Sequence, residues 1–352
     1  MSTVNTTVKS SARDATIRLG SLSLRVSPRG LLVGVALTAA VIAVWFIALL
    51  PGSDVMSLSA VLNTLSGNGS PGDEAIVYDW QMPRALTAIE VGLALGLSGA
   101  VFQSLTRNPL GSPDILGFSS GAATGALLSL TVLGTAALPT WLGALAGGAL
   151  SATLIYLVSY NHGIRVHRLV LVGIGMNAIF VAANSMLMAR ADFYDAKSAA
   201  NWLIGTLDGR GWGHVTTIGV TLVVLVPLVL TLGPSLRMLE MGDEHARGLG
   251  LRVELDRFLL IAAGVALLSA AVTAAGPIAF VALAAPQLAK LLCRSGTCPL
   301  IPSALMGALL LQASDVLATT ATEHTLPVGV VTGALGGCYL MWLLGWNRRA
   351  RA

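Results

Sequence analysis

The sequence predicts an all-α, polytopic membrane protein, and three observations support this fold class. Of its 352 residues, 55 % are hydrophobic and only 11 % are charged, whereas soluble domains carry about a quarter charged residues. Apolar runs such as 30–50, 141–160 and 215–232 reach the ~20 residues with which a helix crosses ~30 Å of hydrocarbon. Glycine recurs at four-residue spacing, which allows membrane helices to pack closely.

The apolar runs predict ten membrane spans, of which the second, third, eighth and ninth are interrupted by glycine or proline. The spans are expected at 31–50, 84–102, 114–134, 138–160, 168–190, 214–233, 258–275, 278–292, 302–319 and 328–346. The first follows a polar, basic tail, and its apolar run is longer than that of a cleavable signal peptide. We therefore divide the chain into a basic tail at 1–29, a ten-span domain at 30–346 and a short tail at 347–352.

The connection between the second and third spans is rich in turn residues and reads RNPLGSPDILGFSSGA (107–122). Pro109 and Pro113 cannot continue a helix interior, and Gly111 permits the chain to reverse. Asp114 is expected at the start of the third span, where a carboxylate meets the positive end of the helix dipole. The segment is predicted to be a turn whose polar backbone is buried in protein or lines a cavity.

The connection at 234–257 is the longest polar segment between spans. Asp243 and Glu244 precede Arg247, and two glycines follow, which is typical of a short capped helix.

Basic residues orient the spans. If the N-terminus is cytoplasmic, only Arg84, Arg190, Lys197 and Arg210 fall outside, which leaves 17 of the 21 lysines and arginines inside. Cytoplasmic loops carry such an excess of positive charge. The pattern therefore predicts an even number of spans with both termini in the cytoplasm.

Pairs of glycines four residues apart predict close helix contacts in a compact bundle. They are Gly92/Gly96, Gly121/Gly125, Gly143/Gly147 and Gly329/Gly333/Gly337.

The sequence offers no catalytic constellation. It has no phosphate-binding GxxxxGK[ST] loop, no HExxH and no nucleophile elbow. Its three cysteines form neither a disulfide framework nor a zinc site, and the five histidines fall in loops or at span ends. We therefore expect no catalytic residue, no metal site, no cofactor and no nucleic-acid partner.

Five blocks of sequence closely resemble the permease subunits of ferric-siderophore and vitamin B12 ABC importers, in the order in which they occur in that family. They are 83–122, RLVLVGIGMNAIFVAANSMLMA (168–189), LEMGDEHARGLGLRVELDR (239–257), GPIAFVALAAPQLAK (276–290) and LPVGVVTGALGGCYL (326–340). FQSLTRNPLGSPDILGF and LEMGDEHARGLG are especially similar to a ferric enterobactin permease subunit.

The resemblance implies the type II ABC importer permease fold in the bacterial cytoplasmic (inner) membrane. It implies a transport subunit that moves a ferric siderophore into the cytoplasm by ATP-driven alternating access. The expected partners are a second permease subunit in a heterodimer, two copies of an ATPase subunit and an extracytoplasmic siderophore-binding protein. Two alternatives remain open, a cobalamin or haem importer of the same family and an ion-coupled secondary transporter.

The resemblance also makes 234–257 the coupling segment, which would sit in a groove of the ATPase subunit. The residues that match the family there are Met241, Gly242, Asp243, Glu244, Ala246, Arg247, Leu249 and Gly250. The alternative is a solvated loop.

Arg84 follows Pro83 at the outer mouth of the second span, where the family uses arginines to dock the binding protein. The chain departs from the family at Gln81, where relatives commonly have another arginine, and 317–329 also lacks an arginine that some relatives have. Arg84 is therefore the candidate docking residue, with snorkelling to the membrane surface as the alternative.

Polar residues inside the spans are candidates for the translocation pathway. Glu90 is an acid within the second span, where an acid is costly and faces a cavity or a partner. Structural pairing or a misplaced span boundary would also explain it. Asn177 and Asn184 are seven residues apart and share one helix face, where they either hydrogen-bond a neighbouring helix or line the pathway. Asp315 is expected to be a buried, paired acid, and Gln287 replaces a family histidine.

Overall fold

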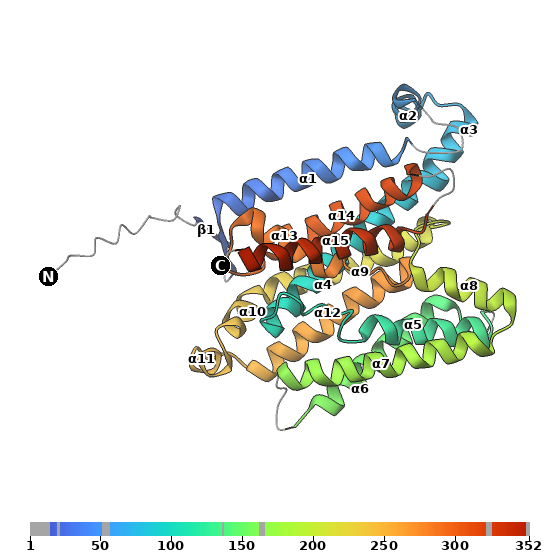
Figure 1. The fold of residues 1–352 in the computed structure, drawn as a ribbon. Helices are drawn as coiled ribbons and strands as arrows, with labels where there is room; N and C mark the ends of the chain where they lie inside the picture. The colour runs from blue at the N-terminus through green and yellow to red at the C-terminus, as the bar shows by residue number, and fades with distance from the viewer. Residues whose placement is uncertain are drawn as a thin grey trace.

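The computed structural model describes residues 15–19, 22–50, 57–135, 137–161, 166–321 and 326–349, and these form a bundle of long helices that lie side by side (Figure 1). The bundle helices are α1 (Pro28–Ala48), α4 (Met82–Thr106), α5 (Phe118–Leu128), α6 (Thr140–Ser159), α7 (Val166–Arg190), α9 (Trp212–Thr231), α12 (Val253–Ala275), α13 (Val281–Cys293), α14 (Leu300–Thr320) and α15 (Val328–Arg349). Each lies at one of the ten expected ranges, and the all-α class is confirmed.

Seven helical stretches are long and apolar enough to cross a membrane, and three further apolar helices are shorter. The shorter ones are Phe118–Leu133, Val281–Cys293 and Val328–Met341 within the described residues. The first continues α5 as the π-helix η2 (Ser129–Leu133). The expected start of this helix at Asp114 is wrong, because the turn that precedes it extends to Gly117.

Smaller elements that the sequence did not predict complete the chain. They are the hairpin of β1 (Ala15–Leu19) and β2 (Leu22–Val26), α2 (Leu58–Leu65), α3 (Pro71–Glu74), the π-helix η1 (Ala75–Gln81) and α8 (Phe193–Ile204). The polar connection at 234–257 forms two short helices instead of one, α10 (Gly233–Glu240) and α11 (Asp243–Gly248).

The core is built around α4 and α12, whose side chains are largely buried. Ser98 of α4 donates a hydrogen bond to the backbone oxygen of Gly264 in α12 at 2.7 Å. The ring of Phe102 lies 5.3 Å from that of Phe118, between centroids, so that α5 packs against the same core.

The glycine spacings place backbones in direct contact, as expected. Gly121 and Gly125 of α5 pack against Gly143 and Gly147 of α6, and a Cβ at any of the four would meet the other helix's backbone or a serine side chain. Gly92 and Gly96 of α4 pack in the same way against α14. This packing replaces the hydrophobic drive that is missing between helices in lipid.

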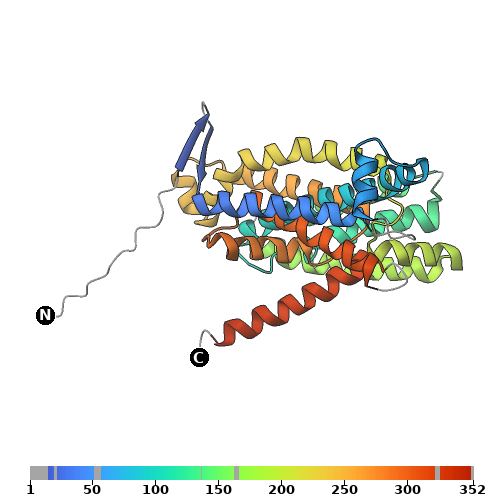
Figure 2. The same cartoon turned by 90° about the horizontal axis from the view of Figure 1, so that it is seen from above.

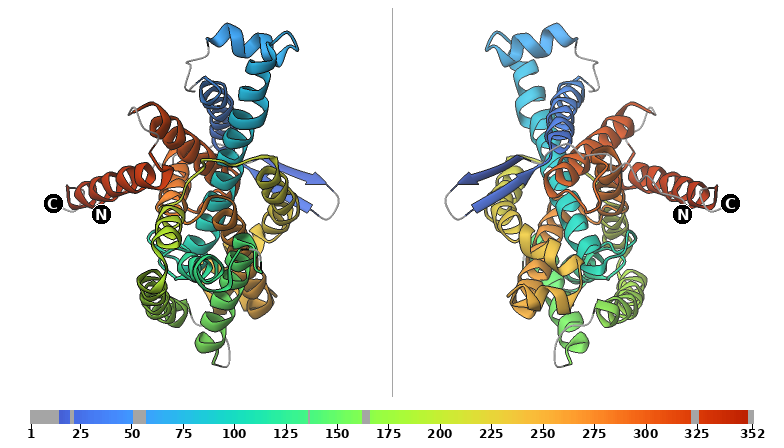
Figure 3. Two further views of the ribbon diagram at one scale, coloured as in Figure 1. Left: turned by 90° about the vertical axis from the view of Figure 1, so that its right-hand side faces the viewer. Right: turned by 90° about the vertical axis from the view of Figure 1, so that its left-hand side faces the viewer.

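The last helix, α15, diverges from the bundle along its length (Figures 2 and 3). Gly329 at its start contacts the backbone of Ile204, whereas Gly333 and Gly337 face open space among the described residues. The predicted close contact of this glycine series is therefore present only at Gly329.

The bundle has two distinct ends. α2, α3 and α8 lie at one end, with the start of α4, and we call this the Arg84 end (Figure 1). α10, α11, the β1–β2 hairpin and the last described turn of α15 lie at the other, which we call the Asp243 end.

Candidate functional sites at the two ends of the bundle

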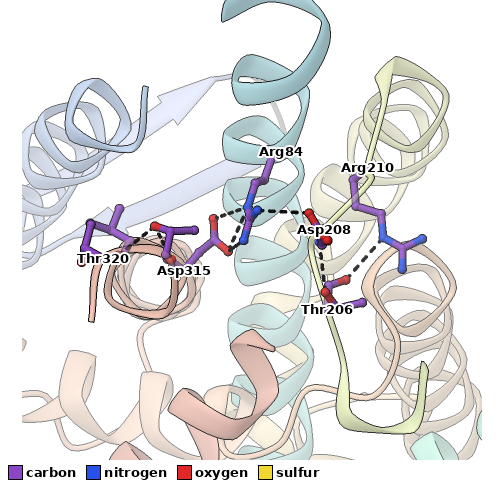
Figure 4. Close-up of polar contacts among 8 residues, drawn as sticks. Arg84, Thr206, Asp208, Arg210, Asp315 and Thr320 are labelled. Atoms are coloured by element: carbon purple, nitrogen blue, oxygen red, sulfur yellow. Dashed lines mark hydrogen bonds and ion pairs between the residues drawn. The ribbon is translucent and has the colours of Figure 1, made fainter. Parts of the chain in front are cut away.

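The centre of the Arg84 end is an ion pair between two bundle helices. Arg84, in the first turn of α4, donates from Nε to Asp315 Oδ2 at 3.0 Å and from Nη2 to Asp315 Oδ1 at 2.9 Å. Asp208, in the loop before α9, lies on the other side of the guanidinium with Oδ1 at 3.5 Å from Nη1 (Figure 4). The expectation that Asp315 is buried and paired is confirmed, since its side chain is 5 % exposed.

This geometry changes how Arg84 can act. Its side chain is 19 % exposed and its charge is shared with Asp315 through two parallel hydrogen bonds, the arrangement for which a guanidinium is best suited. A protein that docks here would therefore contact an Arg84 guanidinium that is already paired with Asp315 of α14. The pair ties α4 to α14 across 231 positions of sequence.

A pocket of about 450 Å³ opens beside the ion pair. Its lining includes Gln81, Asp79 and Trp80 from the segment before α4, Arg210 from the loop before α9, and Thr319 from α14. Arg210 donates from Nε to the backbone oxygen of Thr206 at 3.3 Å, and it forms no ion pair within the described ranges. Burial lowers the pKa of the Arg210 guanidinium, an effect that nearby Asp208 opposes.

Glu90 lies further along α4 and faces α9. A Cβ added to Gly219 of α9 would lie 3.0 Å from Glu90 Oε1, so the absence of a side chain there makes room for the carboxyl group. Glu90 Oε2 is buried without a hydrogen-bond partner among the described residues. Arg84 is thus not its partner, because Arg84 is bonded to Asp315.

Asn177 and Asn184 both face α5, as their spacing predicted. Asn177 Oδ1 accepts a hydrogen bond from Ser120 at 2.6 Å, and Asn184 Oδ1 accepts one from Thr124 at 2.7 Å. Both amide oxygens therefore make interhelical contacts, which was one of the two alternatives for these residues.

The turn at 107–117 explains why this apolar chain contains so many helix-breaking residues in one place. Gly117, with φ of +84°, sits against the backbone of Asn177, and Gly173 of α7 lies against Leu116. The turn therefore packs against the side of α7 rather than passing over the bundle. Irregular backbone in such a position has to be enclosed by protein or line a cavity.

Gln287, where the resemblance implies a histidine, belongs to an amide pair between α13 and α4. Gln287 Nε2 donates to Gln103 Oε1 at 2.6 Å, and Gln103 Nε2 donates to the backbone oxygen of Leu283 at 2.9 Å. Gln103 is buried, so this pair satisfies polar groups inside the bundle.

At the Asp243 end, α11 is a six-residue helix between two glycines in left-handed conformations. Gly242 has φ of +108° and Gly250 has φ of +86°, values that L-residues with a side chain rarely adopt. These glycines permit the sharp turns by which α11 leaves α10 and the chain returns to α12. A Cβ at Gly242 would lie 3.7 Å from Arg107 Nη1, so the 107–117 turn is the neighbour of this segment.

The eight coupling candidates divide by exposure. Met241 and Leu249, at either end of α11, are 58 % and 62 % exposed, and Glu244 and Arg247 are also exposed. Ala246 is fully buried and anchors the inner face of the helix. The outer face thus presents two large apolar side chains with charged groups between them.

Asp243 is turned toward the bundle instead. Its Oδ1 accepts from Arg257 Nη2 at 2.6 Å, and the Arg257 side chain is 3 % exposed. Arg257 Nη1 lies 3.7 Å from Glu254 Oε1, which also lies 3.5 Å from Arg247 Nη2. Sequence reasoning had counted Arg257 only as a charge that marks topology. The signal that could have found it is its place one turn inside an apolar helix, where a cation needs a partner.

The described residues contain no group of three or more histidines, cysteines or acids that could hold a metal ion. What the two ends offer is a set of ion pairs between helices and one exposed short helix. The ion pairs can hold helices to one another, and the exposed short helix can bind another protein.

The comparisons with known proteins agree on one family. Residues 32–346 match the model of the FecCD transport family. The chain is 38 % identical to the ferric enterobactin transport system permease protein FepG of Escherichia coli (strain K12), over 91 % of this chain and 97 % of that protein. It is 34 % identical to the iron(3+)-hydroxamate import system permease protein FhuG of Bacillus subtilis (strain 168), over 86 % and 94 % of the two chains.

A vitamin B12 system is also among the relatives. The import permease protein BtuC of Citrobacter koseri is 35 % identical, over 84 % of this chain and 93 % of that protein. Among solved structures, an inward-facing conformation of a metal-chelate type ABC transporter superposes with a TM-score of 0.79 at 26 % identity, covering 89 % of this chain and 98 % of that chain.

Proposed function

Because the chain belongs to the FecCD transport family, we propose that it imports a ferric siderophore as the permease subunit of an ABC importer. It is a transport subunit and not an enzyme, and ATP would be hydrolysed by a separate subunit of the complex. The relatives in iron(3+)-siderophore systems support the cargo. A cobalamin or haem importer is the second candidate within the family, and the vitamin B12 relative favours cobalamin.

The observation that carries the proposal is the exposed α11 at the Asp243 end. Its outer face presents Met241 and Leu249 on a helix set between two left-handed glycines. A short helix with protruding apolar side chains suits insertion into a groove of a partner. We propose that this partner is the ATPase subunit, and that all eight coupling candidates form the segment that responds to ATP-driven closure.

The orientation follows from the same assignment. The Asp243 end would face the cytoplasm, and the ten bundle helices would be ten spans with both termini inside the cell. The short α13 still fits this count, since it begins beside Gly99, part of the way along α4, where a Cβ would meet the backbone of Ala282. A helix that starts within the bundle needs fewer residues to reach the other surface.

The Arg84 end would then receive the extracytoplasmic binding protein. Arg84 would contribute through its pocket, whose other charged lining residues include the exposed Asp79 and Asp208 and the partly buried Arg210. A second permease subunit, in a heterodimer, would complete the pathway. The diverging α15, with the open face of Gly333 and Gly337, leaves room for such a partner.

For the pathway we propose Glu90, Asn177 and Asn184. Glu90 has the strongest support, because its buried Oε2 lacks a partner within the described chain. The two asparagines would line the pathway while their oxygens hold α5. The Asn184 amide nitrogen also donates to the backbone oxygen of Ser120 in α5 at 3.4 Å.

An ion-coupled secondary transporter would need facing acids of its own in the spans. Glu90 and Asp315 are the two candidates, and Asp315 is bonded to Arg84. The geometry therefore favours the ABC importer.

Uptake by a deletion strain tests the function. Cells that lack the gene would be given labelled ferric catecholates, ferric hydroxamates, ferric citrate and cobalamin, with and without the gene restored. We expect gene-dependent uptake of one ferric siderophore that stops when ATP is depleted while the membrane potential is kept. Uptake that persists without ATP would support the secondary transporter instead, and gene-dependent uptake of cobalamin alone would replace the cargo.

A further inference from the structure

The coupling segment has one buried connection to the body of the bundle that neither its family resemblance nor its exposure explains. Asp243 is the first residue of α11, and it is bonded to Arg257 of α12 at 2.6 Å. The Arg257 side chain is 3 % exposed, whereas Asp243 is 33 % exposed. One partner of the pair thus belongs to the core and the other to the projecting helix.

A helix of six residues cannot set its own direction, because so short a helix is only marginally stable without contacts to the rest of the protein. Gly242 and Gly250 lie in the two connections of α11. Because glycine can adopt many backbone conformations, these connections do not fix the direction of the helix. The orientation of α11 is therefore determined by its contacts with the body. Those contacts are the buried methyl group of Ala246 and the Asp243–Arg257 pair.

Two further polar contacts of the segment also end on α12. Ser235 of α10 donates to Asp256 Oδ1 at 3.1 Å, and Arg247 of α11 lies 3.5 Å from Glu254. Asp256, Glu254 and Arg257 all belong to the first turns of α12. Both ion pairs of α11 within the described residues therefore end on α12.

We propose that Arg257 is a positioning residue for energy coupling: it fixes α11 to α12, so that displacement of α11 by the ATPase subunit is delivered to α12 and the transport core. This inference rests on the proposed function of α11 as the coupling helix. It assigns to Asp243 a role inside the permease, while the contact with the ATPase is left to the exposed residues.

The side chain at 257 has to be arginine for this role. Its two terminal nitrogens address two different acids, Asp243 at 2.6 Å and Glu254 at 3.7 Å. A lysine ammonium is a compact point charge on a flexible stem and cannot hold two groups in a fixed fork. The exposed Arg247–Glu254 pair, with side chains 58 % and 46 % exposed, is screened by solvent and holds α11 only weakly.

A displacement of α12 would be passed to α4 at the centre of the bundle. α12 lies against α4, where Ser98 is bonded to Gly264 and a Cβ at Gly264 would lie 2.9 Å from the Phe102 ring. α4 in turn carries Glu90 and, at its far end, Arg84. A rigid link at Arg257 thus connects α11 to the helix pair at the centre of the bundle.

The test compares transport per ATP hydrolysed in the reconstituted whole importer. Arg257→Met is expected to leave ATP hydrolysis by the assembled complex near the wild-type rate and to lower the transported cargo per ATP by about tenfold. Asp243→Asn should lower the same ratio. Arg257→Lys should fall between, and the exchanged pair Asp243→Arg/Arg257→Asp should recover part of the loss. Arg252→Met, an exposed arginine of the same segment, is the matched control and should behave as wild type.

A structural readout separates positioning from mere stability. Spin labels at His245 on α11 and Leu255 on α12, in a background without the three cysteines, would report whether the two helices move together when ATP binds. We expect a constant separation in the wild-type background and a changed, broader one in Arg257→Met.

Unchanged cargo per ATP in Arg257→Met would overturn the proposal, as would a loss of uptake and ATP hydrolysis that only follows the amount of assembled complex. If the Met variant does not assemble, Arg257→Lys and Asp243→Asn decide by the same ratio. Failure of the proposed function would be visible separately, because the wild-type complex would then show no ATP-dependent transport at all.

Discussion

The two ends of the bundle use charge in opposite ways. At the Arg84 end the central pair joins two long helices, and its side chains are 19 % and 5 % exposed. At the Asp243 end the pairs join a long helix to a short projecting one, and the Arg247–Glu254 pair is about half exposed. The first arrangement joins long helices to each other, whereas the second fastens a short, exposed helix to the bundle. Arg257 is the exception at its end, since it is as buried as Asp315.

The two ends of the bundle also differ in the sign of the charges that they carry. The described segments around the Arg84 end carry six acids besides Asp315, which are Asp73, Glu74, Asp79, Asp192, Asp195 and Asp208, against four cations. The segments at the Asp243 end are rich in arginine. The excess of arginine at the Asp243 end is the feature that sets membrane orientation, and the opposite charge of the two ends predicts different partners for them.

The largest effect on uptake is expected from changing the conformation of the proposed coupling segment. Gly242→Trp should lower uptake by at least about tenfold, the change that ~1.4 kcal/mol produces, while the protein still inserts. A side chain at φ of +108° is strained, and a Trp there would also crowd Arg107. Uptake and membrane level would be measured together.

Alanine variants isolate the backbone contribution from bulk. Gly242→Ala should reduce uptake, since a residue held in a disfavoured backbone region costs ~1–3 kcal/mol. Gly248→Ala is the matched control, because Gly248 lies in α11 with open space around it and no left-handed φ. For the tryptophan variant of the first prediction, normal uptake and normal binding of the ATPase would show that α11 is not the coupling helix.

The second effect concerns the stability of the Arg84 end. Asp315→Leu leaves the Arg84 charge with only the exposed Asp208 beside it, and breaking a buried pair from one side costs ~3–5 kcal/mol. The double variant Arg84→Met/Asp315→Leu should lose less, because no charge is then left unpaired. Thermal unfolding of the purified protein in detergent would measure both.

Asp208→Asn provides the control for this end, because the Asp208 side chain is 71 % exposed. Its effect should stay within about 0.5 kcal/mol, as is usual for surface substitutions. If the double variant is less stable than Asp315→Leu alone, the loss does not come from an unpaired Arg84 charge, and this explanation is wrong.

A third, smaller effect is expected on docking. Arg84→Glu places a carboxylate opposite Asp315 and should weaken binding-protein affinity by roughly tenfold, ~1.4 kcal/mol. Arg210→Gln should weaken it only a few-fold. High salt should weaken docking of the wild type, because exposed charges are screened over ~10 Å at 0.1 M salt.

Binding of the purified binding protein at low and high salt would measure these differences. Affinity is compared per assembled complex, because Arg84→Glu also breaks the pair with Asp315, whereas Arg210→Gln leaves that pair intact. Affinity that does not depend on salt and is the same in both variants would remove this pocket from the docking surface.

Hydropathy and glycine spacing were enough to predict the bundle, because lipid imposes both helix length and close packing locally in sequence. The contacts of Gly121 and Gly125 with α6 were predictable for that reason. The partner of Arg84 was not, since Asp315 lies 231 positions away and several acids could have served. The packing of the 107–117 turn against α7 was also missed, because its residues signal a turn but not where the turn lies. The coupling role proposed for α11 came from the resemblance, whereas its link to Arg257 came only from the structure.

The smallest effect expected is at Glu90, and it asks how far the polar character of the Arg84 end extends along α4. Glu90→Gln keeps the hydrogen-bonding groups and should stay within about twofold of wild-type uptake, well under the ~1.4 kcal/mol of a tenfold change. Glu90→Leu should lower uptake several-fold at an unchanged protein level, because it removes the polar group that faces Gly219. A cysteine at position 90, in a background without the native cysteines, should react with a water-soluble thiol reagent. A cysteine at Ala88, which is fully buried, is the matched control and should stay unreactive. If the cysteine at 90 is equally unreactive and the Leu variant transports normally, Glu90 belongs to the Arg84 end of the bundle and not to the pathway.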